Sequence, residues 1–466
     1  MTPASIIPTP MGWAVAGGGR AANVAAGTRY AGTTSQLCGL FPFAVASGAT
    51  LTGVPLGRSL HTAEPVGLDP AHWLRTGLIS NTGVWVQGQP GIGKSSITKR
   101  LVVGLVGFGM RALIPGDIKG EYTALITALG GTVWRLGRGH HTLNPLDPGL
   151  AAPALAAAVG TQRHQIGENL RTRTLALLEA LLAITSGRAL SATGRRLLAT
   201  ALDQTTATRI EPTIPDLLHA LTVGADPLPQ IVAADAERDY ARAVRGLVNT
   251  LGLLCDGSLR GLFDRPSTIT ADPTTPALSL DLSALDNDAD DVVAAAMLCS
   301  WAWSATLADT AGDHRNTVQV QDELWRALRA APGLVEHSDR ITRLGRHRGI
   351  VSVQVTHSLD DLDALPTPTD RAKARGMAAR NAILILGGMA PQDLDRLTGI
   401  AALTHPERDL VASWAAPPTW HPGHIHPGRG RYLIKSGQRI GLPVGLRLTP
   451  TEAGLYDTDT AFRTPL

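Results

Sequence analysis

The chain has 466 residues, a formal net charge of +3 and an apolar content of 44%. This length allows about two to four structural units and a sizeable core, and the small charge excludes nucleic-acid binding through overall charge alone. The three cysteines, Cys38, Cys255 and Cys299, are odd in number and far apart. That pattern excludes a disulfide framework and a Cys-x-x-Cys metal site, and it fits a reducing cytosol.

The sequence indicates neither a signal peptide nor a membrane span. The N-terminus lacks a basic region, and Pro8 and Pro10 interrupt its apolar stretch. The longest uncharged apolar run, Val292–Ala308, is bracketed by Asp291 and Asp309 and is typical of a buried helix. We therefore expect a cytoplasmic protein that is peripheral at the cytoplasmic face of the membrane only through its partners.

The first two segments carry weak patterns. Residues 1–32 are rich in Gly, Ala and Pro, which predicts a loose lead-in or the tail of something longer. Residues 33–82 hold short apolar clusters separated by glycine and proline, which predicts a small segment of strands and turns packing on the core.

The stretch from Gly88 to Ser95 spells G-x-x-x-x-G-K-S, between a predicted strand (Val84–Val86) and a predicted helix (Ser95–Val106). This is the context that a phosphate-binding loop requires. Its glycines allow successive N–H groups to face phosphate oxygens, and the helix N-terminus adds a partial positive charge. Lys94 would reach the β- and γ-phosphates of ATP, and the Ser95 hydroxyl would bind Mg²⁺. The predicted nucleotide-binding residues are Gly88, Gln89, Pro90, Gly91, Ile92, Gly93, Lys94, Ser95 and Ser96.

Strands and helices alternate from residue 83 onward, except in residues 150–256. That segment is rich in Ala, Leu and Arg with helical spacing, which predicts an all-α insertion. The remaining predicted strands are Arg111–Pro115, Thr132–Leu136, Ala277–Leu282, Thr317–Gln321, Ile350–Val355 and Asn381–Leu386. The other predicted helices are Tyr122–Leu129, Val292–Ala308, Leu334–Arg346 and Pro391–Leu397. A hairpin is predicted at Arg431–Ile434 and Arg439–Val444.

This alternation predicts an α/β core with a mostly parallel sheet over residues 83–149 and 257–466, and with its ligand at the carboxyl ends of the strands.

Acidic residues follow the strand at Thr317–Gln321. Asp322 would hold Mg²⁺, and Glu323 would polarise the attacking water. The alternative is a surface Asp-Glu pair that caps a helix.

Two further candidates are polar or basic groups near the next strand. Gln354 could hydrogen-bond the attacking water or the γ-phosphate, unless it is a glutamine satisfied at a strand edge. The arginines between residues 340 and 348 could form a solvated face, or could present an arginine to the phosphates of a neighbouring subunit. Arg343 and Arg346 are the candidates for that role.

Several stretches together resemble the ATPase portion of the TraC/VirB-four type of conjugative type IV secretion ATPases, in the HerA–FtsK superfamily. The resemblance covers about residues 33–148 and 257–466, without the large N-terminal domain of such proteins. The motifs that carry it, beyond the phosphate loop, are Thr34-Ser35-Gln36 with Pro42-Phe43, Gly67-Leu68-Asp69-Pro70, Pro115-Gly116-Asp117-Ile118-Lys119-Gly120-Glu121-Tyr122, Asn144-Pro145-Leu146-Asp147, Asp322-Glu323-Leu324-Trp325, Arg343-Leu344-Gly345-Arg346 and Gln354-Val355-Thr356-His357. It marks Asp117, Lys119 and Glu121 as additional site residues.

The resemblance implies a RecA-like P-loop core with an inserted helical subdomain, ATP hydrolysis, a hexamer and a trans arginine near Arg343–Arg348. It also implies work at a conjugative secretion channel. Two other functions stay open: a DNA-pumping translocase or coupling protein, and a nucleotide-gated assembly module with negligible turnover. DNA is therefore a further candidate partner, beside the channel components and other copies of the chain.

Overall fold

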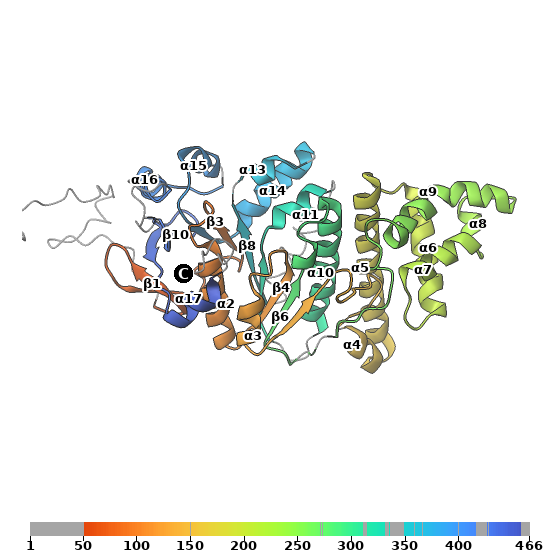
Figure 1. The fold of residues 1–466 in the computed structure, drawn as a ribbon, viewed down its shortest axis with the longest axis horizontal. Coiled ribbons are helices and arrows are strands. Elements are labelled where there is room, and N and C mark those ends of the chain that lie inside the picture. The colour runs from red at the N-terminus through yellow and green to blue at the C-terminus, as the bar shows by residue number, and fades with distance from the viewer. Residues whose placement is uncertain are drawn as a thin grey trace, which may run out of the picture.

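The computed structural model describes residues 51–149, 151–270, 272, 274–310, 315–330, 335, 349–357, 359–365, 367–398, 400–415, 426 and 428–457 (Figure 1). The strands are β1 (Val54–Ser59), β2 (Pro65–Leu68), β3 (Val84–Gln87), β4 (Arg111–Asp117), β5 (Thr132–Arg135), β6 (Ala277–Asp281), β7 (Thr317–Gln321), β8 (Ile350–Thr356), β9 (Ile383–Leu386), β10 (Arg431–Lys435) and β11 (Leu442–Gly445).

The principal helices of the core are α2 (Lys94–Gly107), α3 (Thr123–Ala128), α10 (Asp290–Thr310), α11 (Leu324–Ala330), α14 (Pro368–Arg380), α15 (Pro391–Leu397), α16 (His405–Ser413) and α17 (Pro450–Tyr456), with the short α1 (Pro70–Arg75) and α13 (Asp360–Asp363). The insertion contains α4 (Ala151–Ala157), α5 (Gly160–Ser186), α6 (Ala192–Thr208), α7 (Ile214–Val223), α8 (Leu228–Ile231) and α9 (Glu237–Asp256).

One sheet joins all the described strands, in the order β2-β1-β11-β10-β9-β3-β8-β7-β4-β6-β5. The pairs from β9 to β5 are parallel, whereas β2, β1, β11, β10 and β9 pair antiparallel. The α/β core with a mostly parallel sheet, the inserted helices and the C-terminal hairpin are therefore confirmed. The β1–β2 hairpin extends the same sheet by pairing with β11. The predicted helix at Leu334–Arg346 falls outside the described residues except for Val335.

The two faces of the sheet bury different sets of residues because successive side chains of a strand point to opposite faces. Val84 and Val86 of β3 pack with Ile97 and Leu101 of α2 on one face. Trp85, between the two valines, belongs to the other face, which α10 covers. This alternation decides which polar side chains can reach the cavity described below.

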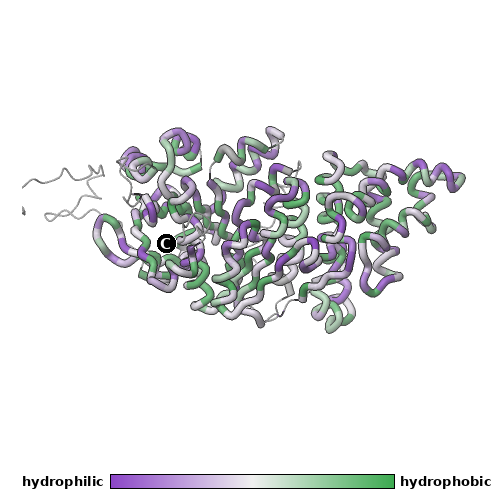
Figure 2. The backbone as a smooth tube through the Cα atoms, viewed as in Figure 1, coloured by the Kyte–Doolittle hydropathy of each residue, from purple (hydrophilic) through white to green (hydrophobic). Residues whose placement is uncertain are grey.

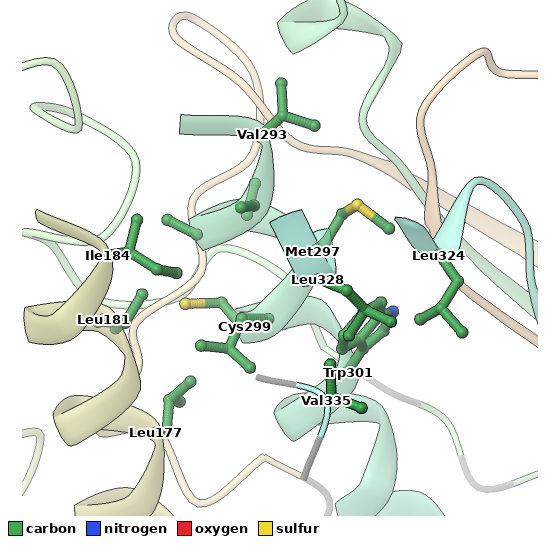
Figure 3. Close-up of a cluster of buried hydrophobic side chains, with 14 of the residues drawn as sticks. Leu177, Leu181, Ile184, Val293, Met297, Cys299, Trp301, Leu324, Leu328 and Val335 are labelled. Atoms are coloured by element: carbon green, nitrogen blue, oxygen red, sulfur yellow. The ribbon is translucent and has the colours of Figure 1, made fainter. Parts of the chain in front are cut away.

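Helix α10 joins the sheet to the insertion. Its residues from Val292 to Leu298 are all buried, as expected for an apolar run without a hydrophilic face. Figure 3 shows Cys299 facing Leu177 and Leu181 of α5 on one side, with Trp301 beside Leu328 of α11 on the other. The helix is thus packed on all sides, and within the described residues no helix combines the length and apolarity needed to cross a bilayer.

The Asn-Pro-Leu-Asp motif lies at the root of the insertion and has a structural role. The Asn144 side chain donates to the Pro212 carbonyl (2.8 Å) and accepts from the Leu146 amide (3.0 Å). The Asp147 carboxylate accepts from the Gly149 amide at 2.8 Å. Figure 1 shows the insertion, in yellow and green, extending from one end of the sheet, and the tip at its far end is hydrophilic in Figure 2.

A buried ion pair secures the antiparallel half of the sheet. Lys435 of β10 is 1% exposed, and its ammonium donates to both oxygens of Glu407 on α16 (2.8 and 2.9 Å). Glu407 also accepts from the amides of Gly441 (2.6 Å) and Thr404 (2.8 Å). Hydrogen bonds on both oxygens compensate the desolvation of this carboxylate.

Lys435→Met should therefore lower the free energy of unfolding by about 3–5 kcal/mol, because it leaves Glu407 buried and unpaired. Urea denaturation of the purified chain measures the change. Arg375→Met is the control, since it breaks an exposed pair with Asp363 that should contribute only about 0–1 kcal/mol. An equal loss in the two variants would contradict the argument, and Lys435→Met combined with Glu407→Gln should recover part of the stability.

Candidate functional site

A cavity of about 640 Å³ lies at the carboxyl ends of β3, β4, β7 and β8, which is where open parallel sheets bind ligands. Its volume is in the range of small-molecule sites. The residues that line it are Pro90, Gly91, Gly93, Lys94, Ser95, Ser96, Asp117, Ile118, Lys119, Glu121, Asp322, Glu323, Val355, His357, Arg429, Leu448, Ala453, Tyr456 and Asp457.

The glycine loop curls over the N-terminus of α2. Gly93 caps this helix with φ +99°, a left-handed conformation in which a side chain would be strained. A Cβ atom there would also lie 2.8 Å from the Tyr432 hydroxyl, which donates to the Gly93 carbonyl at 2.6 Å. The first amides of α2 therefore open onto the cavity, where they favour an anion.

Lys94 is a buried cation that forms no ion pair with any described residue. Its ammonium donates to the carbonyls of Gly88 (2.7 Å) and Gln89 (3.1 Å) and lies 2.8 Å from Nδ1 of His357. Burial lowers the pKa of Lys94 to about 8, although nearby Asp322 and Glu323 act to raise it. Among the described residues, no carboxylate lies within ion-pair distance of this ammonium. A phosphate group in the cavity would supply the missing charge.

Glu323 is held by donors on both of its oxygens. Its Oε1 accepts from Lys119 Nζ (2.5 Å) and lies 3.0 Å from His357 Nε2, and its Oε2 accepts from Trp325 Nε1 (2.6 Å). Burial alone would raise the pKa of Glu323, but the bonds to His357 and Lys119 outweigh it and hold the pKa at about 2. The backbone of Glu323 has φ +51°, a strained value for a residue with a side chain. Such strain persists only where the surrounding contacts fix the residue.

Asp322 points to the same cavity with different electrostatics. Its Oδ2 accepts from the hydroxyl of the fully buried Tyr122 at 3.0 Å. Burial, together with the charges of Glu323 and Glu121, raises the pKa of Asp322 to about 6. Ionising a buried carboxylate beside other carboxylates is costly, and a bound cation would offset that cost.

The loop after β4 is shaped by Asp117. Its carboxylate accepts from the amides of Glu121 (3.0 Å) and Tyr122 (2.8 Å). Burial raises the pKa of Asp117 to about 7, against the effect of these backbone bonds. The resulting turn places Lys119 on Glu323 and Tyr122 on Asp322. All three residues that the resemblance marked in this loop, Asp117, Lys119 and Glu121, line the cavity.

Magnesium would fit this set of donors. Ser95 and Asp322 both line the cavity, and Mg²⁺ is usually bound by one or two protein oxygens together with substrate phosphates and water. In the described part of the chain no group of three or more His, Cys, Asp or Glu residues is placed to hold a metal by itself. A metal here would therefore depend on the phosphates that Lys94 attracts.

Most of the predicted site residues meet at this cavity, and some act through their backbone. Gly88 and Gln89 accept from Lys94 through their carbonyls, and the carbonyl of Ile92 accepts from the Gly430 amide at 3.0 Å. Arg343 and Arg346 lie outside the described residues.

Gln354 is a correction to the sequence-based expectation. It lies within β8 and is fully buried, and its side chain donates to Gln321 Oε1 (3.3 Å) and accepts from Asn381 (3.1 Å). It does not line the cavity. The alternation along β8 explains this: Val353 and Val355 face α2, so Gln354 points to the opposite face of the sheet.

Sequence reasoning assigned no role to His357, which occupies the position expected of Gln354. It follows the last residue of β8 and connects Lys94 with Glu323. The signal was available, because residues just beyond the carboxyl end of a central parallel strand face the ligand edge. Arg429 and Tyr432 were also missed, since nothing local in the sequence shows that β10 begins beside the glycine loop.

The fold is similar to those of two solved structures. The chain aligns with VirB4 of Thermoanaerobacter pseudethanolicus with a TM-score of 0.65 and 21% identity, over 87% of this chain and 100% of that one. The chain has a VirB4-like fold. It is also similar to the plasmid coupling protein TrwB in complex with ADP and Mg²⁺, with a TM-score of 0.52 and 13% identity, over 86% of this chain and 91% of that one.

These structural alignments show the fold, and at the level of the fold they confirm the resemblance seen in the sequence motifs. No family model matches the chain, and no curated protein matches it.

The raised pKa of Asp322 leads to a stability prediction. Because its folded-state pKa of about 6 exceeds the unfolded value of about 4, ionisation of this group destabilises the fold. The cost is absent below pH ~4, grows as the pH rises to ~6 and is complete above that. Asp322→Asn should thus stabilise the nucleotide-free chain at pH 8 by about 2–3 kcal/mol, which a rise in its melting temperature would show.

At pH 4.5 the same variant should gain little. Asp409→Asn on the exposed face of α16 is the matched control, and it should leave the melting temperature unchanged at both pH values. A gain for Asp322→Asn that is equal at both pH values would refute the electrostatic explanation.

Proposed function

We propose that this chain is a Mg²⁺-dependent ATPase that powers DNA or protein transfer through a conjugative type IV secretion system. The observation that carries the proposal is Lys94: a buried ammonium at the N-terminus of α2 that forms no ion pair with a described residue, in one cavity with Asp322 and Glu323. The VirB4-like fold supports the same reading, and the similar protein TrwB was solved with ADP and Mg²⁺.

The glycine loop and Lys94 bind the phosphates of ATP, and Ser95 and Asp322 hold the metal. Bound Mg²⁺ supplies charge neutralisation on the β- and γ-phosphates. The Tyr122 hydroxyl donates to Asp322 Oδ2 and the Glu323 amide donates to Oδ1, both at 3.0 Å, so that both oxygens of the carboxylate are fixed in position at the cavity. Phosphoryl transfer needs mainly positioning and charge stabilisation, and these residues provide both.

Glu323 orients the attacking water. With a pKa of about 2 in the nucleotide-free chain, its carboxylate is a weak base and a strong hydrogen-bond acceptor. This favours a water-positioning role over early proton abstraction, in keeping with a loose transition state. The imidazole of His357 contacts both Lys94 and Glu323. A phosphate that binds Lys94 would therefore change the hydrogen bonding of Glu323 through this one side chain.

The working assembly is a hexamer at the cytoplasmic side of a secretion channel, in which Arg343 or Arg346 reaches the nucleotide of a neighbouring subunit. The hexamer and the trans arginine rest on the resemblance in the sequence motifs, and the similarity in fold to VirB4 supports the secretion channel as the place of work. A DNA-pumping role remains the second candidate, supported by the similarity to a coupling protein.

Removing the proposed catalytic groups should abolish turnover in distinct ways. Lys94→Ala should weaken ATP binding and lower kcat/KM by at least about 100-fold, because it removes the cation that compensates the phosphates. Glu323→Gln should lower kcat by about 100-fold while ATP binding persists. Phosphate release measures turnover, and calorimetry with ADP measures binding. Wild-type turnover in both variants would refute the ATPase, and turnover that requires DNA would favour the translocase.

A third variant tests whether His357 or Gln354 contributes to turnover. His357→Ala should lower kcat by about 10- to 100-fold with little change in ADP affinity, since the imidazole contacts Glu323, which orients the attacking water. Gln354→Ala is the comparison, because Gln354 is buried on the other face of the sheet. It should reduce stability more than it reduces kcat at a temperature where the variant is folded. The reverse pattern would assign the hydrogen bond to the attacking water or the γ-phosphate to Gln354 instead.

A further inference from the structure

A tight turn places one arginine against the glycine loop. Gly428 lies so close to Trp414 that a Cβ atom would be 2.0 Å from its carbonyl oxygen, and Gly430 has φ +75°. Neither position tolerates a side chain without a shift. The Gly430 amide donates to the Ile92 carbonyl (3.0 Å), and the Leu446 amide donates to Gly430 (2.7 Å). The turn is thus clamped, and the one side chain between its two glycines is that of Arg429, which lines the cavity.

The order of the strands puts Arg429 on the opposite side of the glycine loop from the carboxylates. Three strands, β8, β7 and β4, lie on one side of β3. At their carboxyl ends are, in turn, His357, the pair Asp322–Glu323, and Asp117. Arg429 precedes β10, which lies on the other side of β3, next to β9. Because β10 runs antiparallel to β9, its first residue is at the same edge of the sheet as the carboxyl ends of the parallel strands.

The charge of Arg429 is available to a ligand. Its guanidinium is exposed and makes no hydrogen bond or ion pair with any described residue. It acts on the buried Tyr432 hydroxyl, where burial raises the pKa and Arg429 opposes the rise. That hydroxyl is bonded to Gly93, so Arg429 stands beside the loop that binds phosphates. A guanidinium here suits a phosphate oxygen, with two parallel donors in a fixed plane.

We infer that Arg429 binds the phosphates that ADP and ATP share, on the nucleoside side of the loop. The inference rests on the proposed function and divides the cavity into two ends. At the hydrolytic end, Glu323 and His357 act on the terminal phosphate. At the other end, Arg429 binds the phosphates that ADP and ATP share, so this contact does not depend on the terminal phosphate.

The test compares binding with turnover in Arg429→Ala, Arg429→Lys and Arg431→Ala. Arg431 is the matched control, because it is exposed at the start of β10 and does not line the cavity. Calorimetry with ADP, and with AMP-PNP as a non-hydrolysable triphosphate, gives the two dissociation constants in the presence of Mg²⁺. Phosphate release at saturating ATP gives kcat.

Arg429→Ala should raise the dissociation constants of ADP and AMP-PNP by a similar factor of about 10, the loss of one charge-assisted hydrogen bond. Any fall in its kcat at saturating ATP should be smaller than the loss of affinity, and Arg429→Lys should recover part of the affinity. Glu323→Gln should show the opposite split, with kcat lost and ADP affinity retained.

Three outcomes would overturn the inference: unchanged ADP affinity in Arg429→Ala, a loss confined to AMP-PNP, or an equal loss in Arg431→Ala. The last would mean that overall charge, rather than this position, sets the affinity. If the wild-type chain itself binds no ADP, the proposed function fails first, so the two failures are distinguishable.

Discussion

The cavity depends on how the sheet brings distant strand ends together. Parallel strands all finish at one edge, so Lys94, Asp322 and His357, which are up to 263 positions apart, contact one another or a common neighbour there. The result is an ammonium, two carboxylates and an imidazole that line one cavity. Each group perturbs the ionisation of its neighbours, and the perturbations have opposite signs: Glu323 becomes a stronger acid and Asp322 a weaker one. Two adjacent carboxylates thereby acquire different chemistry from their surroundings alone.

The sequence was informative where local physics decides the outcome. The glycine loop, the alternation of strands and helices and the apolar α10 each carry a periodic or compositional signal that acts over a few residues. Nearly every parallel strand begins or ends within a residue or two of its expected position. Asp322 and Glu323 were identifiable because they follow a buried strand at the edge where ligands bind.

The errors arose where a contact joins distant parts of the chain or where one residue of register matters. Gln354 and His357 are three positions apart, and both are polar residues near the end of β8. Only the direction of the pleat, fixed by Val353 and Val355 packing on α2, shows that the first faces away from the cavity. The role of Tyr432 depends on β10 lying beside β9, a pairing that no short sequence pattern encodes. Sequence periodicity therefore defined the elements, whereas tertiary packing selected which of their polar groups meet.

The root of the helical insertion has a consequence for how this architecture can vary. The chain leaves the core near Leu143 and returns near Leu262, and the Leu143 amide donates to the Leu262 carbonyl at 3.1 Å. Thr142 likewise bonds the Pro266 carbonyl (2.9 Å), and the Asn144 amide bonds Ser267 (2.9 Å). The segments that enter and leave the insertion are hydrogen-bonded to each other, so the core fixes the width of this junction. Beyond the junction, α5 packs against α10. Lengthening or shortening the helices between the two points costs little closure entropy. The insertion can thus diverge in size and surface character between related proteins while the chemistry at the sheet edge stays fixed.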